Sequence, residues 1–132
     1  MNSLINKFKK IEREIAKERG PFYLFGIFIP QEKDDFIDVV ASADWFYKSE
    51  RKTLDYFFMV IKKYLNESEM TKISRVVLLK PNEEFVKYVN ETFLNLGAIN
   101  FNNVTINGID FKNVCIITSK TKGDLINHPE LI

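Results

Sequence analysis

The residues in this sequence that could perform phosphoester chemistry are a few carboxylates and a lysine near predicted strand ends. Asp110 and Lys112 flank Phe111, and the alternation of a strand places both side chains on one face. A magnesium-dependent nuclease needs carboxylates and a lysine that converge at such a place. Asp38 and Asp44, which lie in and just after an earlier strand, are the acids that would have to complete the set.

The spacing of Asp110 and Lys112 resembles the D-x-K half of the restriction-type nuclease motif. In those nucleases the other acid lies upstream on the neighbouring strand, but here no aspartate occurs between Asp55 and Asp110. The neighbouring strand offers only Asn102 and Asn103. A metal-dependent phosphodiesterase or nuclease is therefore kept as an alternative, and solvated side chains on an exposed hairpin are the simpler interpretation.

Other catalytic classes lack the residues that they need. A serine or cysteine hydrolase requires a histidine beside its nucleophile, and the single histidine, His128, falls in the C-terminal tail. Cys115 is the single cysteine and lies in an apolar strand, where a thiol is usually inert. One cysteine and one histidine cannot supply a four-ligand zinc site, and the five glycines follow no phosphate-binding spacing. We expect no cofactor, and the lack of these residue sets favours a protein that is not an enzyme.

Basic residues recur on the first predicted helix, and contact between them and phosphates would make a nucleic-acid-binding module. Glu12, Glu14 and Glu18 interleave with them, which is typical of a solvated face. The charge of the whole chain is nearly balanced, with 19 Lys plus Arg against 18 Asp plus Glu. Nucleic-acid binding is therefore a second alternative. The basic residues are Lys7, Lys9, Lys10, Arg13, Lys17 and Arg19.

Helices and strands that alternate along the chain must position these side chains. Apolar residues recur at helical spacing in three segments, and apolar runs of strand length occur in five. The predicted helices cover 3–19, 49–65 and 82–96, and Gly20 and Pro21 end the first of them. The predicted apolar stripes are Leu4, Phe8, Ile11 and Ile15 in the first helix and Phe85, Val89, Thr92 and Leu96 in the third.

Asn107-Gly108 predicts a two-residue hairpin turn that pairs Ile106 with Ile109. The predicted strands cover 22–29, 36–43, 73–79 and the two sides of that turn. The strands 22–29 and 36–43 should form a second antiparallel hairpin, and the strand 73–79 should be buried.

This order predicts an α/β fold of the mixed α+β kind. Helical connections on both sides of the strand 73–79 require crossovers, whereas the two hairpins require antiparallel pairs. We therefore expect a mixed five-stranded sheet with three helices, in the order α-β-β-α-β-α-β-β. A length of 132 residues with 45% hydrophobic residues fits one core, so we expect a single domain over residues 1–122 and a C-terminal tail over 123–132.

The second predicted helix carries apolar residues on two sides. A stripe that includes Phe58 and Ile61 should face the core, whereas Tyr56 and Met59 should point away from it. Aromatic and methionine side chains are typical of interfaces between proteins. Tyr56, Met59 and the single tryptophan, Trp45, are therefore the candidate interaction surface.

Asp44 and Trp45 follow three small residues at the end of a predicted strand, where loops tend to carry function. The simpler interpretation is that Asp44 caps a turn while Trp45 closes one end of the core. The segment therefore carries two interpretations, one functional and one structural.

These observations together predict a non-catalytic interaction or regulatory domain that self-associates, so its partner would be a second copy or another protein. No stretch approaches the roughly 20 apolar residues of a membrane span, and the first residues show no signal-peptide pattern. A single cysteine fits a reducing compartment. We expect a cytoplasmic protein with no membrane partner.

Overall fold

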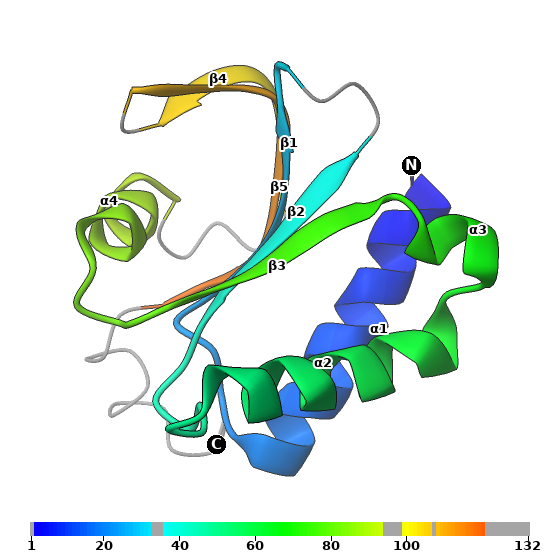
Figure 1. Cartoon of the computed structure of the whole chain (residues 1–132). Helices are drawn as coiled ribbons and strands as arrows, with labels where there is room; N and C mark the ends of the chain where they lie inside the picture. Colours follow the sequence, from blue (N-terminus) through cyan, green and yellow to red (C-terminus); the bar gives the residue numbers. More distant parts are fainter. Residues whose placement is uncertain (1, 33–35, 94–98, 107, 121–132) are drawn as a thin grey trace.

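The computed structural model describes residues 2–32, 36–93, 99–106 and 108–120, and these form one sheet with helices on both faces (Figure 1). The elements are α1 (Asn2–Arg19), β1 (Leu24–Pro30), β2 (Ile37–Ser42), α2 (Glu50–Tyr64), α3 (Glu67–Met70), β3 (Ile73–Leu79), α4 (Glu84–Phe93), β4 (Ile99–Ile106) and β5 (Ile109–Ser119). The predicted α+β fold with a mixed five-stranded sheet is confirmed. The short helix α3 is one more than the sequence predicts.

The strands lie in the order β3-β2-β1-β5-β4. Within the described sheet only the β2–β3 pair is parallel, because α2 and α3 carry the chain back before β3 begins. The predicted pairing of β1 with β2 and the predicted register of Ile106 opposite Ile109 are both confirmed. Gly108 has a φ of 80°, as a tight turn demands. Three predicted features lie outside the described residues: Asn107 of the turn, the end of the predicted helix 82–96, and the predicted tail 123–132 with His128.

Strand β3 lies at an edge of the sheet, which corrects the sequence-based expectation of a buried strand. Its only strand neighbour in the described sheet is β2. None of its residues is fully buried. A run of apolar residues signals an apolar environment, but it does not distinguish an edge strand that is covered on its faces from a central one.

Helices α1 and α2 cover one face of the sheet (Figure 1). The predicted stripe of α1 is confirmed, since Phe8, Ile11 and Ile15 have no exposed surface. Aromatic rings fill the space between the helices and the sheet. The ring of Phe22 lies 5.0 Å from that of Phe25 and 6.0 Å from that of Phe57, both edge to face.

The orientation of α2 differs from the predicted one. The helix buries Thr53, Tyr56, Phe57, Val60 and Ile61. Tyr56 therefore faces the core, and of the two residues expected on an outer surface only Met59 is exposed. The Tyr56 hydroxyl donates to Glu18 Oε1 at 2.6 Å. The polar partner of Tyr56 therefore comes from the end of α1. The spacing of apolar residues within α2 cannot indicate a partner on another helix.

The opposite face is covered by α4 over part of its area (Figure 1). Val86 and Val89 are fully buried there, whereas Thr92, predicted in the buried stripe, is exposed. Asn90 takes the inward position, since its side-chain amide donates to the Lys120 carbonyl and accepts from the Ser119 hydroxyl. These hydrogen bonds make a polar residue compatible with burial at the end of β5.

The packing of the aromatic core predicts that replacing two different phenylalanines with alanine has very different effects on stability. Phe57→Ala should lower the free energy of unfolding by about 3–5 kcal/mol, because it leaves a cavity among packed rings. Phe36→Ala is the matched control, and it should change stability by less than about 0.5 kcal/mol because Phe36 is 52% exposed. Urea unfolding followed by circular dichroism measures both, and similar losses would contradict this packing.

Candidate functional site

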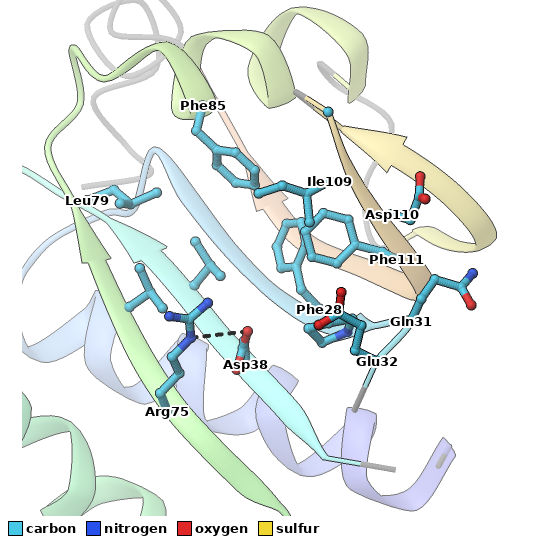
Figure 2. A pocket seen from close by; sticks show the side chains of 14 residues that line it. Phe28, Gln31, Glu32, Asp38, Arg75, Leu79, Phe85, Ile109, Asp110 and Phe111 are labelled. Atoms are coloured by element: carbon cyan, nitrogen blue, oxygen red, sulfur yellow. Dashed lines mark ion pairs between the residues drawn. The ribbon is translucent and has the colours of Figure 1, made fainter. Parts of the chain in front are cut away.

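A groove of about 630 Å³ opens on the sheet face that α4 covers only in part. Its floor comes from β1, β2 and β3, one wall from β5 and one end from α4 (Figure 2). Most of its lining is apolar, but it also contains four charged side chains. The residues used below are Phe28, Glu32, Asp38, Val40, Arg75, Val77, Leu79, Phe85, Ile109, Asp110 and Phe111.

A bend in β5 forms one wall of the groove. Pro30 pairs with Phe111 and Ile29 pairs with Asn113, so the register between β1 and β5 skips Lys112. An extra residue of this kind bends a strand and increases its twist. Beyond the bend the β4–β5 hairpin arches over the sheet face toward α4 (Figure 1). The hollow between the hairpin, α4 and the strands below them is the groove.

The apolar wall consists mainly of aromatic rings. The ring of Phe28 lies 5.2 Å from that of Phe111 and 5.7 Å from that of Phe85. Phe28 and Phe111 are buried, Phe85 is half-buried, and Ile109 above them is 50% exposed. The wall therefore presents apolar surface at the mouth of the groove while its base belongs to the core.

An ion pair lies across the groove from these rings. Asp38 on β2 pairs in register with Arg75 on β3, and Arg75 Nε lies 3.2 Å from Asp38 Oδ2 (Figure 2). The Asp38 side chain is 4% exposed, whereas that of Arg75 is 64% exposed. Asp38 Oδ1 is buried and accepts no hydrogen bond from any described residue. A buried carboxylate that lacks one of its hydrogen bonds is energetically costly, so this oxygen favours an additional donor.

The other acids of the groove differ in orientation. The Glu32 side chain is turned toward the groove and the Asp110 carboxylate is turned away from it (Figure 2). Asp110 Oδ1 accepts from the Thr105 hydroxyl at 2.6 Å. The groove lining therefore contains two carboxylates, that of Glu32 turned toward the groove and that of Asp38 paired with the guanidinium of Arg75.

The predicted nuclease residues are brought together only in part. Asp38 and Asp110 line the same groove, but Asp38 pairs with Arg75 and Asp110 with Thr105. Lys112 lies at the bend, exposed and outside the groove lining. Among the described residues no three His, Cys, Asp or Glu side chains lie close enough together to hold a metal ion. The convergence that the nuclease hypothesis requires is thus not found in that part of the chain.

Asp44 and Trp45 lie at the other end of β2. The Tyr23 hydroxyl donates to Asp44 Oδ2 at 2.6 Å, and burial together with this carboxylate raises the pKa of Tyr23 to about 12. Asp44 also borders a smaller hollow of about 340 Å³, which lies beside the ends of β2 and β3. Trp45 is half-buried against Phe57, with ring centroids 6.0 Å apart, so it has the position expected of a residue that closes the core.

Two of the basic residues of α1 make contacts within the chain. Lys7 Nζ lies 2.7 Å from Glu69 Oε1, and this ion pair holds the pKa of Glu69 below its usual value. The Arg19 guanidinium lies 4.8 Å from the ring centre of Tyr56 and 5.6 Å from that of Tyr47. These contacts connect α1 to α2 and α3, and nucleic-acid binding through α1 stays a prediction.

Sequence reasoning missed Arg75, and it interprets the acidic loop that contains Glu32 as a solubilising loop. Asp38 and Arg75 are each a charged residue within an apolar strand, and this shared feature is the signal that could have connected them. Glu32 belongs to a loop, and no sequence pattern indicates that it turns toward the sheet.

Comparison with protein-family models, with curated protein sequences and with solved structures gave no significant match. None of the helices in the described residues combines the length and apolar character that crossing a membrane requires. The groove itself is therefore the basis for inferring a function.

The ion pair predicts a stability effect that depends on both partners. Arg75→Ala should lower the free energy of unfolding by about 1–2 kcal/mol, because it leaves the buried Asp38 carboxylate without its cation. The paired change Asp38→Val with Arg75→Val should recover most of that loss, since it leaves no unpaired charge.

Arg51→Ala on α2 is the control, because Arg51 is an exposed arginine far from the groove lining. It should change stability by less than about 0.5 kcal/mol in the same urea titrations. If Arg75→Ala had no larger effect than Arg51→Ala, the Asp38–Arg75 contact would not stabilise the fold.

Proposed function

We propose that this protein is a non-catalytic binding domain that holds a small amphipathic ligand in the groove. The single observation that carries the proposal is the combination of a 630 Å³ groove with an apolar lining and a buried carboxylate, Asp38, that has one oxygen without a hydrogen bond. Ligand sites are typically concave and mostly apolar, with a few polar groups that fix orientation.

Two features of the groove support ligand binding over simple incomplete packing. The aromatic wall of Phe28, Phe85 and Phe111 is held by contacts between its own rings, so its shape does not depend on an occupant. The Asp38–Arg75 ion pair lies across the groove from this wall (Figure 2). A ligand with an apolar body and a hydrogen-bond donor fits that separation.

A cytoplasmic location belongs to the same proposal. Cys115 is buried, and burial raises the pKa of its thiol, which lowers the fraction of reactive thiolate. Such a cysteine suits a compartment in which thiols stay reduced.

The proposal predicts that Ile109→Asp weakens the binding of an apolar probe. Ile109 lies at the mouth of the groove, and replacing it with a charged residue removes apolar contact worth about tenfold in affinity. Fluorescence titration with Nile red, a neutral dye, gives the affinity. Amide chemical shifts should move at Phe28, Val77 and Leu79 when the dye binds.

Met59→Asp is the matched control for this substitution. Met59 is 52% exposed and Ile109 is 50% exposed, but Met59 lies on α2 at the opposite face of the sheet. Met59→Asp should leave dye binding unchanged. Shift changes centred on α2, or equal effects of the two substitutions, would overturn the groove as the binding site.

We propose self-association through the edge of β3 as a second function. The segment Val76–Leu79 is apolar and half-buried, and β3 has only one strand neighbour in the described sheet. Edge strands of this kind favour pairing with another chain. This proposal transfers the predicted self-association from the surface around Tyr56, which is buried, to the sheet edge.

Sedimentation velocity over a range of micromolar concentrations tests the second function. A dimer that pairs through β3 should show a sedimentation coefficient that rises with concentration, and amide exchange in Val76–Leu79 should slow in parallel. A monomer at every concentration would remove this proposal and leave the groove unaffected.

A further inference from the structure

We propose that the ligand of the groove is an organic cation, namely a protonated amine on an apolar chain, whose ammonium group binds Asp38 while its chain lies on the aromatic wall. This inference rests on the proposed binding function and names the chemical class of the ligand. Three observations carry it: the unsatisfied oxygen of Asp38, the charge balance of the groove, and the aromatic rings opposite.

The buried carboxylate provides the first argument. Asp38 Oδ1 accepts no hydrogen bond from the described residues, and Oδ2 receives only the longer contact of 3.2 Å from Arg75 Nε. Asp38 lines the groove, and rotation about the terminal torsion of an aspartate is soft, so the carboxylate can reorient toward a donor in the groove. An ammonium group that donates there satisfies the acceptor and adds a charge-assisted hydrogen bond.

The charges of the groove provide the second argument. The groups that face inward are two carboxylates, Glu32 and Asp38, and one guanidinium, that of Arg75, which pairs with Asp38. The inward groups thus carry a net negative charge, which favours a cation and disfavours an anion. The Arg75 side chain is 64% exposed, so solvent already stabilises its charge and it can remain hydrated when an ammonium approaches Asp38.

The aromatic wall provides the third argument. Phe85 and Phe111 present ring surface to the same groove, and Phe28 supports both rings. Such rings attract cations electrostatically and offer apolar area to an alkyl chain. Val40 and Val77 on the floor continue this apolar surface between the rings and Asp38. One molecule with a charged nitrogen and an alkyl chain can therefore contact both parts of the groove.

The unsatisfied acceptor also distinguishes among cations. A primary ammonium has three N–H donors, whereas a quaternary ammonium has none. The cation–π contribution of the rings is available to both. Because the acceptor of Asp38 is the unsatisfied group, we expect a primary amine to bind more tightly than its trimethylated counterpart.

Four probes with the same alkyl chain test the inference: hexylammonium, hexyltrimethylammonium, hexanol and hexanoate. Titrations followed by amide chemical shifts should show hexylammonium binding at least about tenfold more tightly than hexanol or hexanoate, since one hydrogen bond to a charged group accounts for that ratio. Added salt should weaken the binding of hexylammonium more than that of hexanol.

Asp38→Asn should remove most of the preference for hexylammonium while hexanol binds as before. Asp55→Asn on α2 is the control, because Asp55 is an exposed aspartate outside the groove lining, and it should leave the preference intact. Glu32→Gln provides a second test at an exposed position where folding is not at risk, and it should reduce the preference by a smaller factor.

The outcomes separate this inference from the proposed function. If all four probes bound in the groove with similar affinity, or if hexanoate bound best, the amine would be the wrong ligand class while the groove stayed a binding site. If none of the probes, nor Nile red, shifted groove amides, the binding function itself would fail. Retention of the preference in Asp38→Asn would overturn the role of Asp38.

Discussion

The apolar residues on both faces of β1 are the constraint on which the rest of the structure depends. Phe25 and Ile27 face α1 and α2, whereas Leu24 and Phe28 face the side of α4. Both faces must be covered, because exposing them would cost the hydrophobic stabilisation of the core. Two long helices cover the first face. The second face has one helix of ten residues and a bent hairpin, and the area between them is left open as the groove.

The parts of the fold that local chemistry determines were predictable from the sequence. The glycine and proline after α1, the apolar stripe of that helix and the register around Gly108 follow from neighbours within a few residues. The rotation of α2 was not predictable, because it depends on where the end of α1 lies. Tyr56 is inward because Glu18 and Arg19 satisfy its polar and aromatic groups. The edge position of β3 likewise depends on pairing between distant segments.

The candidate site was likewise predictable only in part from the sequence. The sequence indicates Asp38 and Asp110 by their chemistry, and both do line the groove. The partner of Asp38 was not predicted, because the register of β2 against β3 is set across a crossover that contains two helices. That pairing changes the chemistry of Asp38 from a free metal ligand to half of an ion pair. The bend that skips Lys112 breaks the strict alternation on which the sequence-based placement of Lys112 relied.

The central place of β1 and β5 has a consequence for how the chain reaches this structure. Leu24 pairs with Ser119, so the first and last described strands are neighbours in the middle of the sheet. Contacts so distant along the chain form slowly, because a long loop must close before they contribute any stability. A ribosome-bound chain cannot complete this sheet until β5 has emerged. Until then β1 lacks its partner β5, and the described sheet is completed only after translation of β5.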